Sequence, residues 1–372
     1  MSIVSVMFDT IIRNVRIIED ELWKFVDLGI INERFAEISP TITGSARNEV
    51  DGDSAYCLPG SVDLHVHFNE PGRSHWEGFT TGSAAASAAG ITYLAEMPLN
   101  SIPSTTSVDA LKTKLSAINN KSYLDFGLWG GVVPGNVNDL EPLAKAGVIG
   151  FKAFMAPSGN DDFENSDNST LREAMFRIAQ TGRRLALHAE DKAVLNRASK
   201  RLKRTVSAFD WDASRPVEAE ISATKTAIEL SVDTGCPITI VHVSSVEVLN
   251  LIQNAKRQGV DITCETCPHY LLLSRVDADS IGADAKCAPP LRSKARMRAM
   301  EEAVFDNLID TIGSDHSPSP PEMKKDKPFF DAWGGIAGIQ HGYPLLLSRY
   351  GMDILPRIKL IQRLCCENPA KI

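Results

Sequence analysis

The chain has 372 residues, of which 43% are hydrophobic and 23% are charged, as is ordinary for a globular enzyme. Its formal net charge of −8 and its lack of a basic cluster argue against a nucleic acid or an anionic membrane as the partner. No apolar run approaches the roughly 18 residues of a membrane span, and the N-terminus lacks a signal-peptide pattern, so we expect a cytoplasmic protein.

The first part of the chain predicts short strands joined by turns. The run from Phe8 to Ile18 alternates weakly between apolar and polar residues, and 22–38 carries β-branched and aromatic residues interrupted by Gly29 and Asn32. We therefore assign residues 1–58 to a small β portion and residues 59–372 to a larger second domain.

From residue 61 onward, short apolar runs alternate with helical segments, as in repeated βα units with a parallel sheet. Ser107 and Ser245 stand at expected helix starts, and Gly90 and Gly235 at expected helix ends. Eight parallel strands fit a TIM (β/α)8 barrel; the alternative, a doubly wound open sheet, lacks a nucleotide-binding glycine fingerprint. The expected strands are 62–68, 91–97, 124–132, 148–154, 184–190, 238–244, 261–266 and 309–314, and the expected helices are 81–89, 107–118, 170–181, 217–232 and 246–258.

The seven cysteines are irregularly spaced and predict no disulfide framework. Cys264 and Cys267 form a C-x-x-C pair, but no second pair follows at the spacing of a zinc ribbon. We interpret the two as buried reduced thiols, with a structural or redox role as the less favoured alternative.

His65 and His67 are the strongest indication of chemistry in the chain. One residue separates them near the end of an expected strand, so both imidazoles point to the same side. Two neutral imidazoles in one space are typical ligands of a divalent metal. The alternative is a hydrogen-bonded histidine pair at the rim of a barrel.

Four more candidate residues lie in or just after other expected strands: Lys152, His188, His242 and Asp315. The carboxyl ends of the strands meet at one face of a TIM barrel, so we expect all four to converge with the histidine pair. Taken singly, such a histidine fits a hydrogen-bonded core position and such an aspartate fits a helix cap. Together, the set suits a binuclear site for zinc or a similar metal.

Lys152 is the only lysine within the expected core strands. An ammonium group beside metal ions would be repelled and costly to desolvate. The neutral amine can instead react with carbon dioxide to give a carbamate, an anionic ligand able to bridge two cations. The alternative is a lysine paired with a carboxylate at the barrel mouth.

Nine longer motifs, spread over the whole chain, resemble those of the cyclic amidohydrolases of the amidohydrolase superfamily. Segments 70–78 and 97–100 are most similar to those of allantoinases. The resemblance implies a small N-terminal β-sandwich portion that later strands return to complete. The chain ends before such a return, so we expect an incomplete sandwich with an unpaired edge. The motifs cover 59–67, 70–78, 96–100, 150–154, 187–190, 241–245, 265–270, 314–318 and 332–336.

The resemblance also implies a mechanism and an assembly. Two divalent metals, zinc or else cobalt or manganese, would lower the pKa of a bridging water and polarise a ring carbonyl, while Asp315 moves the proton. The expected reaction opens allantoin to allantoate in a homotetramer. The implied ligands are His65 and His67 for one metal, His188 and His242 for the other, carboxylated Lys152 between them, and Asp315 on the first.

Close relatives differ at the position two residues after the second histidine. Dihydroorotases usually carry an arginine there, which grips a substrate carboxylate, whereas this chain has Asn69, which suits a neutral ring. The expected substrate contacts are Asn69, Asn100 and Ser317. The alternatives within the enzymes are a dihydroorotase or a hydantoinase/dihydropyrimidinase. The alternative from another class is a non-catalytic scaffold; the retention of every implied metal ligand argues against it.

Overall fold

The computed structural model describes residues 7–203, 205–351 and 354–372, which divide into two compact units. The first holds the described residues of Met1–Pro59 and Gly351–Gln362, and the second those of Gly60–Tyr350 and Arg363–Ile372. The assignment of residues 59–372 to a single domain stays a prediction. In this division, the described residues of 351–362 group with the first unit and not with the rest of that range.

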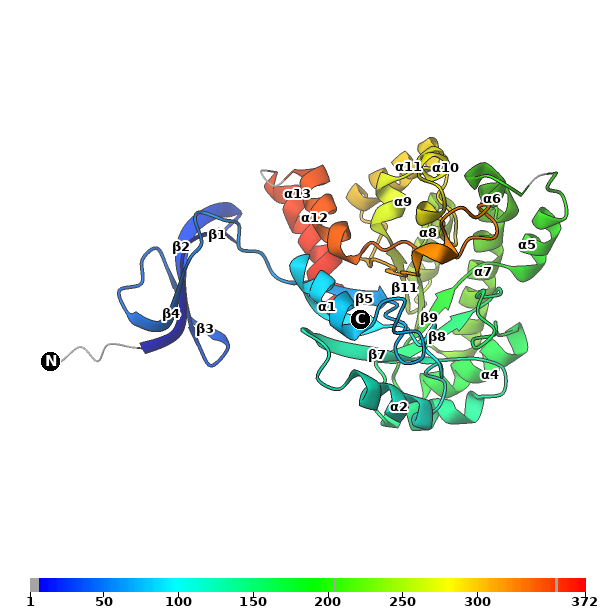
Figure 1. Cartoon of the computed structure of the whole chain (residues 1–372), viewed down its shortest axis with the longest axis horizontal. Helices are drawn as coiled ribbons and strands as arrows, with labels where there is room; N and C mark the ends of the chain where they lie inside the picture. Colours follow the sequence, from blue (N-terminus) through cyan, green and yellow to red (C-terminus); the bar gives the residue numbers. More distant parts are fainter. Residues whose placement is uncertain (1–6, 204, 352–353) are drawn as a thin grey trace. The chain divides into compact units, whose positions relative to one another are not determined.

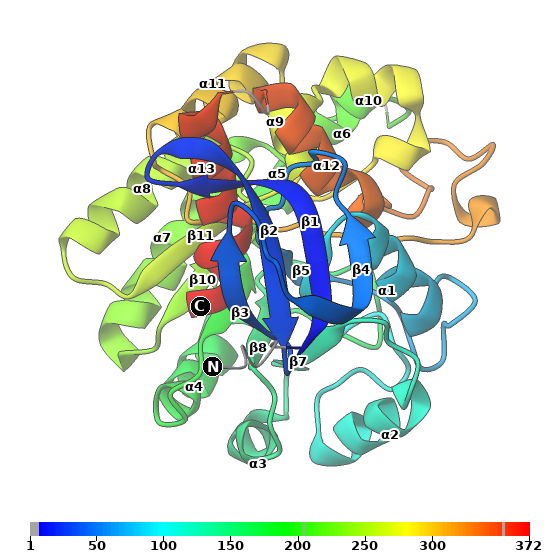
Figure 2. The same cartoon turned by 90° about the vertical axis from the view of Figure 1, so that its left-hand side faces the viewer.

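The N-terminal residues form one four-stranded sheet in the order β3-β2-β1-β4 (Figure 2). Strand β1 is antiparallel to β2 and parallel to β4. Phe8 and Ile11 of β1 are buried and pack in one cluster with Ile42; because the two are three residues apart, simple alternation along the strand does not account for their common burial. The elements of this unit are β1 (Met7–Glu19), β2 (Leu22–Ile31), β3 (Arg34–Ser39), β4 (Ser45–Asp51) and α13 (Leu355–Gln362).

The second unit contains a parallel eight-stranded sheet whose strands follow one another in chain order. The backbone N–H of His67 donates to the carbonyl of His316 at 2.8 Å, and that of Ser314 to Asp63 Oδ1 at 3.1 Å. These bonds join the first strand to the segment after the last, so the barrel is nearly closed and the expected TIM fold is confirmed. The strands are β5 (Ser61–Val66), β6 (Ile91–Glu96), β7 (Asp125–Gly131), β8 (Gly150–Phe154), β9 (Leu185–His188), β10 (Ile238–Ile240), β11 (Ile262–Thr266) and β12 (Thr311–Ile312).

Helices of this unit lie around the strands (Figure 1). All five expected helices are present as α1, α2, α4, α7 and α8. Ser107 caps α2 as expected, whereas Ser245 precedes α8 without a capping bond from its side chain. The helices are α1 (Phe79–Ala88), α2 (Val108–Ile118), α3 (Leu140–Lys145), α4 (Asn168–Ala179), α5 (Lys192–Ser199), α6 (Ala208–Ser214), α7 (Val217–Thr234), α8 (Val246–Arg257), α9 (Pro268–Leu272), α10 (Arg275–Ile281), α11 (Lys294–Phe305) and α12 (Ile339–Tyr350).

The strands that carry the candidate residues are almost entirely buried. Every residue of β8, β9 and β10 is buried, because helices cover a parallel sheet on its outer face and side chains fill the barrel.

The glycines expected at helix ends have positive φ, 82° at Gly90 and 71° at Gly235. None of the described helices is both long and apolar enough to cross a membrane.

Candidate metal and substrate site

A pocket of about 370 Å³ opens among the residues that follow the barrel strands. One part of its lining comes from strand-end residues, and another comes from aromatic side chains in loops, among them Trp211, Phe330 and Trp333. A pocket with a polar end and an apolar wall is suited to a small ring-shaped ligand. The polar lining includes His65, His67, His188, His242, Asp315 and Arg215.

His65, His67 and Asp315 form a compact group of possible metal ligands. The Nε2 atoms of His65 and His67 lie 3.2 Å and 3.5 Å from Oδ1 of Asp315. One donor atom from each residue falls within 4.8 Å of the others, so this group could hold a metal ion. His65 lies on β5, His67 directly follows that strand, and Asp315 follows β12.

The other two histidines continue this group. The ring centroid of His242 lies 5.5 Å from that of His65 and 4.7 Å from that of His188. Nδ1 of His188 faces Nε2 of His242 at 3.0 Å. The structure thus brings together all four strand-end histidines that the sequence singled out.

Lys152 on β8 is fully buried, and its Nζ has no hydrogen-bond partner among the described residues. Burial lowers the pKa of this lysine to about 8 despite the nearby carboxylates of Asp315 and Glu265. An unpaired buried ammonium is costly, so the environment favours either the neutral amine or a modified side chain.

For His65, His67 and His188, hydrogen bonds fix which ring nitrogen faces the group. His65 donates through Nδ1 to Glu265 at 2.6 Å, and His188 donates through Nε2 to Glu190 at 2.7 Å. Nδ1 of His67 lies 3.2 Å from the carbonyl of Leu99. Carboxylates that hold the outer nitrogen of a histidine are typical of metal centres, where they orient the ring.

Burial lowers the pKa values of His67, His188 and His242, so these rings are neutral at neutral pH. Neutral imidazole is the form that binds a metal. Together with the unpaired Nζ of Lys152 and the unpaired Nδ1 of His242, this donor set fits a metal centre.

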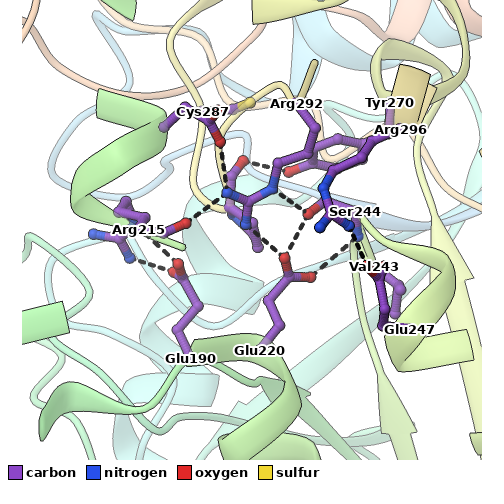
Figure 3. A network of polar contacts seen from close by, with 12 residues as sticks. Glu190, Arg215, Glu220, Val243, Ser244, Glu247, Tyr270, Cys287, Arg292 and Arg296 are labelled. Atoms are coloured by element: carbon purple, nitrogen blue, oxygen red, sulfur yellow. Dashed lines mark hydrogen bonds and ion pairs between the residues drawn. The ribbon is translucent and has the colours of Figure 1, made fainter. Parts of the chain in front are cut away.

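A wider polar network, which includes Arg215 and Arg292 (Figure 3), extends from Glu190, the hydrogen-bond partner of His188. The guanidinium of Arg215 forms two hydrogen bonds with Glu190. Burial alone would raise the pKa of Glu190, but Arg215 and His188 lower it to about 2. Arg292 lies next to this pair and donates to the Arg215 carbonyl at 2.5 Å and to Glu220 at 2.6 Å. The carboxylate that orients His188 is therefore itself fixed and charged.

The three expected substrate contacts lie at different depths. Asn100 and Ser317 line the pocket. Asn69 is fully buried, and its Oδ1 accepts from Nδ2 of Asn100 at 3.2 Å. In this structure Asn69 therefore positions Asn100, and its own contact with a substrate stays a prediction.

Sequence reasoning assigned no role to Glu190, Glu265 or Arg215. A signal existed for the first two, since Glu190 follows His188 by two residues and Glu265 lies near the end of a predicted strand. No local pattern indicated Arg215, because its partner Glu190 is 25 residues away in the chain.

The chain matches the Amidohydrolase family over residues 56–372. It is 44% identical to an allantoinase of Rubrobacter xylanophilus, over 92% of this chain and 75% of the relative. It is 42% identical to an allantoinase of Bacillus velezensis, over 98% of this chain and 80% of the relative. The solved structure of an L-hydantoinase (dihydropyrimidinase) from Arthrobacter aurescens aligns with a TM-score of 0.92 at 32% identity, over 98% and 82% of the two chains. The chain belongs to the amidohydrolase family.

Proposed function

We propose that this protein is a metal-dependent cyclic amidohydrolase that opens the ring of allantoin to give allantoate. The observation that carries the proposal is the convergence of His65, His67 and Asp315, with donor atoms within 4.8 Å, beside the His188–His242 pair. The choice of substrate is supported by the two allantoinases that share more than 40% of their aligned residues with this chain.

We further propose that two zinc ions occupy the pocket, because histidine and carboxylate ligands suit that metal. His65, His67 and Asp315 would hold one cation, and His188 and His242 the other. When bound, the cations would supply an activated water at neutral pH and a polarised carbonyl.

Lys152 would serve as a ligand between the two cations after it reacts with carbon dioxide. The neutral Nζ forms the new N–C bond, and its proton passes to solvent, which leaves an anionic carbamate. The buried and unpaired Nζ supports this proposal, since the described residues offer no counter-ion hydrogen-bonded to an unmodified ammonium.

Asp315 is suited to move the proton of the reaction. Its carboxylate faces the imidazoles of His65 and His67 at the end of the pocket, where an attacking water would stand. In the proposed sequence, Asp315 accepts a proton as the water oxygen bonds to the ring carbonyl carbon. It then donates that proton to the ring nitrogen as the C–N bond breaks.

A neutral ring substrate is supported by the polar side chains at this end of the pocket. Asn100 and Ser317 offer uncharged donors and acceptors, and Asn69 stands where dihydroorotases usually have an arginine. Hydantoinase activity is the alternative within the family, but the L-hydantoinase structure, at 32% identity, supports it less well than the allantoinases, at 44% and 42% identity, support allantoin.

The expected homotetramer, the cytoplasmic location and the small-molecule partner are further parts of the proposal. A non-catalytic scaffold is disfavoured because every implied metal ligand is retained. Light scattering of the purified protein tests the assembly.

A side-by-side assay tests the proposed substrate. Protein loaded with zinc in the presence of bicarbonate is given allantoin, hydantoin and dihydroorotate at equal concentration. We expect the highest kcat/KM with allantoin. Activity on dihydroorotate without activity on allantoin would contradict the proposal, and so would a higher kcat/KM with hydantoin.

A further inference from the structure

A second group of potential metal ligands shares Asp315 with the first. Cys267 and His269 follow β11, and Asp315 follows the neighbouring strand β12. One donor atom from each of the three falls within 4.8 Å of the other two. None of the proposed catalytic ligands except Asp315 belongs to this group.

The side chain of His269 provides an independent indication of a ligand. His269 is only 7% exposed, and its Nε2 has no hydrogen-bond partner among the described residues. Cys267 is completely buried and is a free thiol. A buried imidazole nitrogen without a partner is costly unless something else satisfies it.

We propose that Cys267, His269 and Asp315 form a further metal site, which binds a borderline divalent cation such as Zn²⁺ or Co²⁺ and inhibits the enzyme. A thiolate, an imidazole and a carboxylate together are a typical ligand set for such ions. Binding replaces the proton of the Cys267 thiol, which passes to solvent, so the sulfur becomes a thiolate ligand.

Inhibition follows from the shared residue. A carboxylate oxygen of Asp315 that coordinates the added ion no longer accepts the proton of the attacking water. The ion reaches this site through the pocket, because Asp315 lines the pocket, whereas Cys267 and His269 are buried and do not line it. This step rests on the proposed function, whereas binding of the ion does not.

The test is a titration of the metal-free protein with Co²⁺, which shows thiolate coordination as a charge-transfer absorption band. Absorbance and the rate of allantoin opening are recorded at each addition. We expect the rate to rise first and then to fall by about a hundredfold or more as the thiolate band appears, since general acid–base catalysis is lost. We also expect the parent to bind one more ion per chain than Cys267→Ser.

Three variants make the result specific. Cys267→Ser removes the thiolate band and the inhibition, and His269→Gln weakens both, which guards against a folding defect in the cysteine variant. Cys287→Ser is the matched control, because Cys287 is another buried free thiol and lines the pocket. The Cys287→Ser variant is expected to keep the thiolate band. A band that survives in Cys267→Ser, or an excess of Co²⁺ that leaves the parent rate unchanged, would overturn the inference. If the band is lost in Cys267→Ser but the parent opens no allantoin at any Co²⁺ concentration, the metal site is supported and the proposed function is contradicted.

Discussion

Nε2 of His188 lies 2.7 Å from Oε2 of Glu190, so the imidazole carries its proton on the side facing the carboxylate. Nδ1 of the same ring is thereby left free to face His242 at 3.0 Å. Arg215 holds Glu190 with two hydrogen bonds and keeps it ionised. This chain of contacts orients one half of the proposed metal site before any ion arrives.

Glu190→Gln is expected to weaken metal binding by about 10–100-fold, because the carboxylate that orients His188 is lost. The dissociation constant is measured by competition with a chelator. Glu220→Gln is the matched control: Glu220 is also buried and paired with an arginine, but it bonds to Arg292 and Ser244 instead of a proposed ligand. Equal metal affinities of Glu190→Gln and the parent would contradict the assigned role.

Lys152 is expected to carry a carbamate when metal and bicarbonate are present. Protein incubated with ¹³C-bicarbonate and zinc would then show a carbamate carbon by NMR, and Lys152→Met would lack it. Lys114 is an internal control, because it is equally buried but its ammonium is paired with Glu96. A carbamate signal that persists in Lys152→Met would show that another amine reacts.

The pair formed by Lys114 and Glu96 predicts a large effect on stability. Both residues are 1% exposed, and Glu96 also accepts from the backbone N–H of Phe68 at 3.2 Å. Lys114→Met alone leaves a buried carboxylate without its partner and is expected to cost about 3–5 kcal/mol in the free energy of unfolding. Lys114→Met combined with Glu96→Leu should recover much of that loss. Urea unfolding measures both, and equal losses in the single and double variants would refute this explanation.

Asp27 predicts a loss of stability in acid. Burial would raise its pKa, but hydrogen bonds from the backbone N–H groups of Asn14 and Ile42 and from Arg13 lower it. A carboxyl whose pKa is lowered on folding stabilises the protein above its unfolded pKa of about 3.9. That contribution is lost as the pH falls through the lowered folded value.

Urea unfolding of the parent and Asp27→Asn at pH 7 and near pH 3 tests this effect. The variant should be less stable than the parent at pH 7, and the gap should narrow in acid. A gap that stays constant over this range would argue against Asp27 as a source of the pH dependence.

The strand positions and the set of converging histidines could be predicted from the sequence because they depend on local patterns. Alternation places His65 and His67 on one side of β5, and a strand-end position is enough to bring His188 and His242 to the same face of the barrel. The orientation of each ring could not be predicted in this way. It depends on partners distant in the chain, such as Glu265, which lies 200 residues from His65.

Other features could not be predicted from the sequence, for more than one reason. Arg292 can be buried because partners distant in the chain satisfy its guanidinium, among them Asp212 and Glu220, which lie 80 and 72 residues earlier. The short helices α9 and α10 carry too few turns to produce a clear period of 3.6 residues. The left-handed backbone at Asn69, with φ of 65°, and its hydrogen bond from Asn100 could not be predicted from the place of this residue after His67; its contact with a substrate stays a prediction.

Removal and return of the metal test the central claim most directly. The protein is stripped with a chelator and dialysed, and the formation of allantoate from allantoin is followed before and after zinc and bicarbonate are restored. We predict that the stripped protein opens allantoin no faster than the buffer does, and that most of the original rate returns with the metal. Metal-free protein that opens allantoin at the full rate would contradict a reaction built on His65, His67, His188, His242, Lys152 and Asp315.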